Sequence, residues 1–409
     1  MYNTMEKDEN TMFKFTHNSL HPLEVEELRR LRHTLHENPE LSEQEHRTTK
    51  LLRDEIRRLG LEEVEFGLPT GLAAVLHGGI PGPMVALRAD IDALPVAEKT
   101  GWEHASKETG RMHACGHDVH MTALLGAAML LSRHRDELCG DVVFVFQPAE
   151  ENMMGAEHVI AAGLFEKLPI RAMFGMHVWP QFDFGMIGLH TGAVMAAKDV
   201  FTITIQGDGG HASAPQCTHD SIVCGAHLIV ALQSIVSRSI SPLENAVVSV
   251  CSVHAGSCDN VIPDEMTLLG STRTFSTSGR ETVLQRIGEL SDAIAAAYGC
   301  RASLSVVHGS PAVINSAALA DVAYEAASTV FGDSGTFNCG SVSISEDFSL
   351  YGGNVPTYYY LFGVRETGTE MPSLHNPCFC PNDRVLPAAA ALLTNSACAY
   401  LARAGVRSL

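Results

Sequence analysis

The chain has 409 residues, which is long for a single core and favours two domains. Hydrophobic residues make up 45% of the chain and charged residues 18%, a balance typical of a folded globular protein and not of a disordered one. The formal net charge of −19 repels phosphate backbones, which argues against a protein that binds nucleic acid.

The start of the chain and the cysteines bear on where the protein resides. Residues 1–19, MYNTMEKDENTMFKFTHNS, lack an apolar core followed by a small-residue cleavage site, so we expect a polar lead-in and no signal peptide. We also expect no membrane span, because no apolar run reaches bilayer length. The eleven cysteines are an odd number without the spacing of a disulfide framework, which favours reduced thiols in a cytoplasmic protein.

Helices and strands alternate through the first half of the chain. Residues 21–59 predict two helices, separated at ENPELS, where Pro39 breaks the apolar period and Ser42 can cap the second helix. Further helices are expected at Asp118 to His134 and around Ala156 to Ala162. The predicted strands are LAAVLHG, MVALRAD, DVVFVFQPAEE, RAMFGMHV and FGMIGLH. This alternation predicts an α/β domain, a mixed sheet with helices on both faces.

The pattern changes near residue 197. Between residues 197 and 309, strands and helices follow in the order β-α-β-β-α-β, which predicts a ferredoxin-like α+β domain with an antiparallel sheet and two helices on one face. After Pro311 the chain returns to a helix, the strand TYYYLFG and an apolar helix from Ala388 to Ala404. We therefore expect a discontinuous first domain, residues 1–196 and 310–409, interrupted by a smaller inserted domain, residues 197–309.

Residues that bind metal ions gather at the ends of the predicted strands. Ligand sites of open α/β sheets lie at the carboxyl ends of strands, and one thiol, three imidazoles and a pair of carboxylates are placed there or next to a predicted helix. This set exceeds what one tetrahedral ion needs, so the sequence predicts two ions with one bridging residue. The residues are Cys115, His117, Glu150, Glu151, His177 and His375.

The carboxylate pair suggests the chemistry. Glu150 and Glu151 follow an unbroken apolar strand, and adjacent side chains at a strand end point in different directions. One can therefore bind a metal while the other faces the bound water. That division predicts metal-assisted hydrolysis, in which the metal lowers the pKa of the water and a free carboxylate accepts its proton.

Eight motifs in order carry a resemblance to a known family. The sequence from about Leu28 to Leu386 resembles the amidohydrolase branch of the dinuclear metallopeptidases, the group of hippurate hydrolases, N-acyl-amino-acid aminohydrolases and auxin-conjugate hydrolases. The motifs are RADIDALP, MHACGHDVH, FQPAEE, GMHVWP, GDGGHASAP, NVIPDE, SEDFSLY and LHNP.

This resemblance implies a role for each candidate residue of the first domain. Glu150 matches the general base, and Asp92 would orient a ligand histidine from behind and so fix its tautomer. The mixed ligand set accepts zinc or manganese, and cobalt in vitro. The two metals would be held by Cys115 as the bridging ligand together with His117, Glu151, His177 and His375.

The resemblance also implies a role for the inserted domain, as a lid that forms a homodimer. His211 would stabilise the tetrahedral oxyanion from the partner subunit, while Asn260 and Arg273 would bind the amino-acid end of the substrate, because a guanidinium suits a carboxylate. The chain departs from the family pattern at ENMMGAE, which bears on the acyl group. It departs again at HNPCFCPND, which adds Cys378 and Cys380 beside the metals.

Taken together, these features predict a cytoplasmic metal-dependent amidohydrolase that cleaves N-acyl amino acids to a carboxylic acid and a free amino acid, with no nucleic-acid or membrane partner. A dipeptidase or carboxypeptidase of the same superfamily is an alternative. A thiol nucleophile at Cys115 is another, but it leaves Glu150, Glu151, His177 and His375 without a role. A metal-bearing paralogue without activity is the third, and the intact base argues against it.

Overall fold

The computed structural model describes residues 13–406, and the chain divides into two compact units. Unit 1 comprises the described residues of 1–192, 314–340 and 347–409, and unit 2 comprises residues 193–313 and 341–346. The predicted insertion, residues 197–309, begins four residues after the start of segment 193–313 and ends four residues before its end. The segment 341–346 was expected in the first domain and belongs to unit 2. Of the predicted polar lead-in, residues 1–12 lie outside the described residues.

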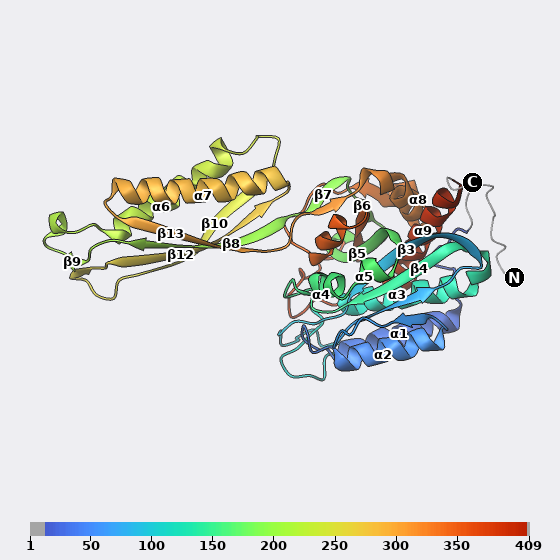
Figure 1. The fold of residues 1–409 in the computed structure, drawn as a ribbon. Coiled ribbons are helices and arrows are strands. Elements are labelled where there is room, and N and C mark those ends of the chain that lie inside the picture. Colours follow the sequence, from blue (N-terminus) through green and yellow to red (C-terminus); the bar gives the residue numbers. More distant parts are fainter. Residues whose placement is uncertain (1–12, 407–409) are drawn as a thin grey trace. The chain divides into compact units, whose positions relative to one another are not determined.

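Unit 1 is built on an eight-stranded mixed sheet with the strand order β1-β2-β4-β3-β5-β16-β6-β15 (Figure 1). The central strand β3 is parallel to β4 and β5, β5 is parallel to β16, and β2 is antiparallel to β4. The strands are β1 Glu62–Val64, β2 Leu72–Leu76, β3 Ile80–Asp90, β4 Cys139–Gln147, β5 Ile170–Asp183, β6 Ile187–Leu189, β15 Thr336–Asn338 and β16 Thr357–Arg365.

Helices cover both faces of this sheet, which confirms the predicted α/β class. Alternate residues of β3, such as Val85 and Leu87, join one core with the apolar helices α3 and α9. On the opposite face, Arg88 of β3 reaches the short helix η5 (Asp347–Gly353), which packs against α4. The helices of unit 1 are α1 Pro22–Glu37, α2 His46–Arg58, α3 His117–Arg133, α4 Gly155–Ala161, α5 Leu164–Lys167, α8 Ala320–Phe331 and α9 Val385–Val406.

Unit 2 has the predicted ferredoxin-like topology. Its antiparallel sheet has the order β10-β12-β8-β13, and the buried side chains of β8, such as Phe201 and Ile203, share one core with α6 and α7. The elements are β8 Ala197–Gln206, α6 Ser221–Arg238, β10 Ala246–Ala255, β12 Glu265–Thr274, α7 Thr277–Ala297 and β13 Arg301–His308. Beyond the end of β8, the two-residue strand β9 (Gly210–His211) pairs with β11 (Val261–Ile262), and the short strands β7 (Gly192–Met195) and β14 (Val313–Asn315) pair with each other.

Two helices meet the length and composition of a membrane span, which corrects the expectation that no apolar segment is long enough. In α9, the apolar stretch Val385–Ala404 is 89% buried, so its apolar character is explained by the core of unit 1. Core helices pass the same test of length and composition. In α6, only 33% of the apolar stretch is buried, so this helix presents apolar side chains on its outer side.

Candidate metal centre

The predicted ligands lie at the level of the sheet where β3 and β4 end. The strand β3 ends at Asp90, β4 leads into Glu150 and Glu151, and β5 carries His177 near its centre. Because β4, β3 and β5 are adjacent and parallel, their carboxyl-terminal segments meet at one edge of the sheet.

The start of α3 adds two more ligands to this edge. Its N-cap Gly116 has a left-handed backbone with φ 84°, and a Cβ atom there would lie 2.5 Å from Cγ2 of Val178 in β5. Only glycine fits both constraints. The close approach presses the loop that carries Cys115 and His117 against the strand that carries His177.

The structure brings all five predicted ligands together in two overlapping groups. Cys115, His117 and His177 form one group, and Cys115, Glu151 and His375 form the other, with the ligand atoms of each group within 4.8 Å of one another. The thiol of Cys115 belongs to both groups, which is the position that a bridging ligand needs. Four of the five residues are largely buried, and the side chain of His375 is 55% exposed.

His117 is oriented to present its Nε2 atom to a metal. Its Nδ1 atom lies 2.9 Å from the backbone oxygen of Asp92 and 3.2 Å from Oδ1 of the same residue, so Nδ1 carries the proton and donates it. The buried Nε2 atom has no hydrogen-bond partner among the described residues. A histidine held from behind by a carboxylate, with its other nitrogen left open, fits a metal ligand.

His177 and Cys115 face each other. The Nδ1 atom of His177 donates to the backbone oxygen of Val178 at 2.7 Å, and its Nε2 atom lies 3.4 Å from Sγ of Cys115. Burial lowers the pKa of His177, which keeps the imidazole neutral, the form that binds a metal. Burial and the carboxylates of Glu151 and Glu150 raise the pKa of the Cys115 thiol. A bound divalent cation reverses that shift, because a coordinating thiol loses its proton.

The carboxylates give the site an excess of negative charge. Burial raises the pKa of Glu151 to about 7. Burial alone would lower the pKa of His117, but the Asp90 and Asp92 carboxylates outweigh it and raise this pKa to about 10. A divalent cation would balance these charges in place of a proton. The donor set and the charge of the site therefore both fit a metal centre.

A buried network that the sequence analysis missed lies behind the ligands. Arg88 donates to Asp90 at 2.7 Å, to Asp347 at 3.0 Å and to Gln147 at 2.9 Å. The other oxygen of Asp90 lies 2.6 Å from Nδ1 of His120, whose Nε2 atom accepts from the backbone of β5. Although His120 lies close enough to Asp90 and His117 to share an ion, both of its nitrogens are already used. The available signal was a lone arginine in an apolar strand, since a buried charge requires a partner.

The three remaining predicted site residues all belong to unit 2, where Arg273 lies in the four-stranded sheet, whereas His211 and Asn260 lie in or beside the separate pair β9-β11. His211 is exposed, and the backbone nitrogen of its neighbour Ala212 donates to the backbone oxygen of Asn260 at 3.0 Å. Arg273 pairs with Lys198 near the start of β8, whereas Glu265, eight positions earlier on β12, pairs with Gln206 at the end of β8. At roughly 3.3 Å per residue, Arg273 lies about 26 Å along the sheet from the end that leads to His211.

The two added cysteines are not part of the ligand groups found among the described residues. The Sγ atom of Cys378 is exposed and lies 3.4 Å from the backbone oxygen of Lys99. Cys380 lines a separate cavity together with Arg32, whose charge opposes the rise that burial causes in the pKa of Cys380.

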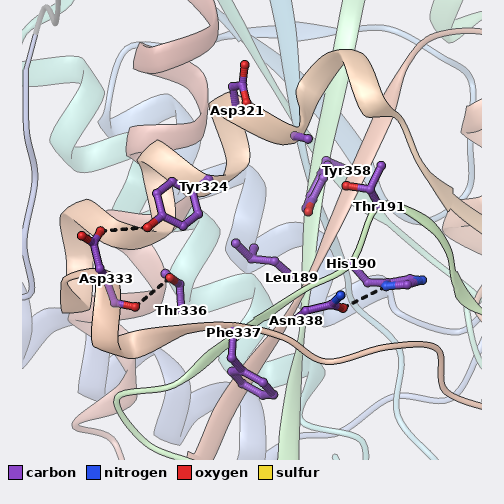
Figure 2. Close-up of a pocket in the computed structure, with 11 residues that line it drawn as sticks. Leu189, His190, Thr191, Asp321, Tyr324, Asp333, Thr336, Phe337, Asn338 and Tyr358 are labelled. Carbon is purple, nitrogen blue, oxygen red and sulfur yellow. Dashed lines mark hydrogen bonds between the residues drawn. The ribbon is translucent and has the colours of Figure 1, made fainter.

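Cavity size does not locate this centre. A cavity of about 570 Å³ lies beside β6, β15 and α8, and Figure 2 shows the hydroxyl of Tyr324 donating to Asp333 across it, at 3.0 Å. None of the predicted site residues lines it. The metal centre is found by its ligand chemistry and not by its volume.

The same strands and ligands lie within the region that matches known proteins. Residues 86–398 match the sequence pattern of peptidase family M20/M25/M40. The chain is 42% identical to the N-acetylcysteine deacetylase of Bacillus subtilis (strain 168) over 363 residues, 88% of this chain and 93% of that protein. It is 38% identical to IAA-amino acid hydrolase ILR1-like 2 of Arabidopsis thaliana over 376 residues, 91% and 84% of the two chains. Its fold matches the crystal structure of the Bacillus subtilis YXEP protein, a dinuclear metal binding peptidase from the M20 family, with a TM-score of 0.84, 36% identity and coverage of 93% and 99%.

Proposed function

The chain belongs to peptidase family M20/M25/M40 and is a metal-dependent amidohydrolase, and from this premise we propose that it cleaves N-acyl amino acids to a carboxylic acid and a free amino acid. One observation carries the proposal. Oε2 of Glu150 and Oε1 of Glu151 lie 3.9 Å and 3.8 Å from Nε2 of His117, but only Glu151 also belongs to the group with Cys115 and His375, which leaves Glu150 beside the ligand set as the base. The names of the two relatives, a deacetylase and an amino acid hydrolase, support the same substrate class.

The chain's own residues divide the work of amide hydrolysis. Two bound divalent ions would supply an acidic water and polarise the amide carbonyl. Glu150 accepts the proton of the attacking water and delivers it to the leaving nitrogen, as a buried carboxylate next to the ligands can. Asp92 keeps His117 in the tautomer that presents Nε2, through the contacts at 2.9 Å and 3.2 Å.

We also propose that the enzyme is a homodimer in which His211 acts on the partner's substrate. An N-acyl amino acid is much shorter than the roughly 26 Å that separates Arg273 from the His211 end of the sheet. His211 and Arg273 of one chain therefore do not contact the same molecule. A two-fold dimer solves this, because the substrate can meet Arg273 of one chain and His211, with Asn260 close to it, of the other.

The surface of unit 2 supports this dimer. β10 is an edge strand of ten residues, and its exposed side chains include Val253, 48% exposed. A long apolar edge strand is a template for pairing with a second chain. Next to it, α6 exposes Val230 at 72% and Val223 at 42%. A second copy of the same strand and helix would cover both.

The metal and the cellular location are further parts of the proposal. We propose zinc or manganese in the cell, with cobalt as a substitute in vitro, because a thiolate, imidazole and carboxylate set accepts all three. We propose a cytoplasmic enzyme, because all eleven cysteines are free.

The decisive experiment is a substrate screen on metal-defined protein. The purified protein is analysed for metal, stripped with a chelator and reloaded with zinc, manganese or cobalt. It is then given N-acetyl, N-benzoyl and long-chain N-acyl amino acids. We expect turnover that disappears with chelation and returns with metal, and that falls at least tenfold when the α-carboxylate of the substrate is replaced by a carboxamide. Fully loaded protein that cleaves dipeptides but no N-acyl amino acid would contradict the proposal.

A further inference from the structure

The backbone directly before the two glutamates is held in a disfavoured conformation. Ala149 has φ 54°, in the left-handed region of backbone conformation, which residues with a Cβ atom rarely adopt. It is fully buried, and it immediately precedes Glu150. Such a conformation persists only where the surrounding structure fixes it, so neighbouring groups must hold this turn.

The carboxylate of Glu45 is one of those groups. The backbone nitrogen of Ala149 donates to Oε1 of Glu45 at 2.8 Å. Glu45 is itself buried and forms the N-cap of α2, where its backbone oxygen accepts from Thr49. Thr49 is tied to the strands in turn, because its hydroxyl accepts from the backbone nitrogen of Gly71 at 2.8 Å. Glu45 is therefore a fixed acceptor and not a mobile one.

A second side chain near Glu45, that of Ser42, helps to fix the backbone on the C-terminal side of Glu150. Ser42 donates to Oδ2 of Asp92 at 2.7 Å, and the same oxygen accepts from the backbone nitrogen of Glu151 at 2.9 Å. The backbone nitrogens of residues 149 and 151 are thus both held by carboxylates that depend on the segment from Ser42 to Glu45. Glu150 lies between these two held positions.

Stability alone does not account for a carboxylate at position 45. Within residues 13–406, Glu45 is 0% exposed and forms no ion pair, and burial raises the pKa of its carboxyl group. Burying a carboxylate in this way costs free energy of folding. A carboxylate kept there despite this cost is explained by the geometry that it imposes on its neighbour.

We propose that Glu45 is a positioning residue, which holds the left-handed turn at Ala149 by accepting its N–H and thereby aims Glu150 at the reacting water and Glu151 at the metals. The proposal rests on the proposed function, because the roles of Glu150 and Glu151 are part of it. It adds a group that lies behind the turn and contacts neither metal nor substrate.

Three variants test this role. Glu45→Gln keeps an oxygen at the acceptor position, Glu45→Leu has a similar size but no acceptor, and Gln44→Ala changes the exposed neighbour as a control. For each variant, kcat and KM are measured with saturating metal, and cobalt affinity is measured by titration of the metal-free protein. We expect Glu45→Gln and the control to stay within about threefold of wild type. We expect Glu45→Leu to lose roughly 10- to 100-fold in kcat and about tenfold in cobalt affinity, with KM changed less than about threefold.

Each result decides between this role and a structural one. The proposal is overturned if Glu45→Leu matches the Gln44→Ala control in both measurements, or if Glu45→Gln is as impaired as Glu45→Leu, since the charge and not the hydrogen bond would then matter. Should Glu45→Leu fail to fold, the double variant Glu45→Leu/Ala149→Gly replaces it, because glycine adopts this backbone without strain. A flexible glycine at position 149 still needs the acceptor to hold Glu150 in place, so the double variant should have a lower kcat than Ala149→Gly, and equal kcat for the two would overturn the proposal. If wild type cleaves no N-acyl amino acid, the proposed function fails, while the cobalt affinities still test the positioning role.

Discussion

Two adjacent glutamates in this chain have different environments. The Glu151 carboxylate belongs to the same group as Cys115 and His375, and its backbone nitrogen is bound by Asp92. The Glu150 side chain is 6% exposed and approaches His117 without entering the group that contains Cys115. Both carboxylates reach Nε2 of His117, at 3.9 Å for Glu150 and 3.8 Å for Glu151, but only Glu151 also lies in a group with Cys115 and His375. Substitution of each glutamate should therefore have a different consequence.

Glu150→Gln should keep both metals and lose nearly all turnover. The amide has the size of the carboxylate but cannot accept a proton from water, and removal of a general base costs roughly two to four decades in kcat. Glu151→Gln is the matched control, and it should lose metal as well as activity. Metal analysis and steady-state kinetics of both variants provide the measurement. A Glu150→Gln enzyme with more than about a tenth of the wild-type kcat would remove this residue from the role of base.

Substitution of cysteines should separate the metal ligand from its neighbours in sequence. Cys115→Ala should lower metal content and activity together, because its thiol belongs to both ligand groups. Cys378→Ala and Cys380→Ala should leave the metal content unchanged, since these thiols contact Lys99 and Arg32 instead. Metal content of the three purified variants is compared by elemental analysis. Equal metal loss in all three would point to a metal site in the C-terminal segment.

The sequence identified these ligands but not the groups that hold them. Cys115 and His117 are recognisable because thiols and imidazoles bind metals, and because the two residues lie close together in a short motif. The predicted helix cap at Ser42 is wrong, because α2 begins after its N-cap Glu45. The hydroxyl of Ser42 donates to Asp92 instead. A contact across fifty residues leaves no periodic trace in a sequence. Supporting groups of this kind require the fold.

Whether a helix or strand could be predicted depended on its length and on its pattern of apolar residues. The strands β3, β4 and β5 are evident as long apolar runs, and the helices of unit 2 as long runs with a helical period. Strands of three residues, such as β1 and β15, are too short to show one. The order β-α-β-β-α-β predicted the topology of unit 2, whereas segment 341–346 joins that unit through contacts that the sequence order does not indicate.

A buried ion pair joins three elements of unit 2. Arg280 of α7 donates to Asp199 of β8 at 2.8 Å and to the backbone oxygen of Gly309, just after β13, at 2.9 Å. Burial alone would raise the pKa of Asp199, but the hydrogen bond and charge of Arg280 outweigh it and lower this pKa below its ordinary value. The pair therefore ties α7 to the start of β8 and to the end of β13, which lie side by side.

Arg280→Leu should destabilise the protein in a pH-dependent way. At pH 7 it removes the arginine from a buried carboxylate and leaves His308, 3.2 Å away, as the neighbouring group, and we expect a loss of about 3 kcal/mol in the free energy of unfolding. Because the folded pKa of Asp199 lies below the unfolded value, its contribution is complete above that unfolded value, near pH 4, and is lost as the pH falls through the folded pKa. The difference between variant and wild type should thus shrink at pH 3 in urea unfolding followed by circular dichroism.

The matched control for this pair is Arg286→Leu, on the same helix. Its partner Glu289 is exposed, and such a pair contributes little to stability because water screens its charges. Equal losses for Arg280→Leu and Arg286→Leu at pH 7, or an Arg280→Leu loss that does not change with pH, would show that the pair is not a stabilising contact.

At the scale of the whole molecule, the positions of His211 and Arg273 pose a geometric problem. We propose that both act on one substrate, yet Arg273 lies at one end of the four-stranded sheet and His211 lies beyond the other end, in the pair β9-β11. The proposed dimer, in which each chain supplies His211 to the other, would let both act. The residues in this sequence could predict which side chains take part, but not the distance between them, because that distance is set by the length of β12 and β8.

The proposed exchange of histidines between chains can be tested with mixed dimers. His211→Ala should remain folded and metallated but nearly inactive, because a donor that stabilises the developing oxyanion contributes roughly two to three decades in kcat. Glu150→Gln is inactive for a different reason. When the two are co-expressed in equal amounts, half of the dimers are hybrids, and each hybrid contains one site with an intact base and the partner subunit's intact His211. We therefore expect about a quarter of the wild-type activity from two inactive parents.

The matched control co-expresses wild type with the double variant Glu150→Gln/His211→Ala. If His211 acts on the partner's substrate, both sites of those hybrids are dead and about a quarter of the activity remains, whereas a histidine that acts within its own chain leaves about half. Hybrids verified by mass that show no activity above the two parents, together with half activity in the control, would place His211 in the site of its own chain.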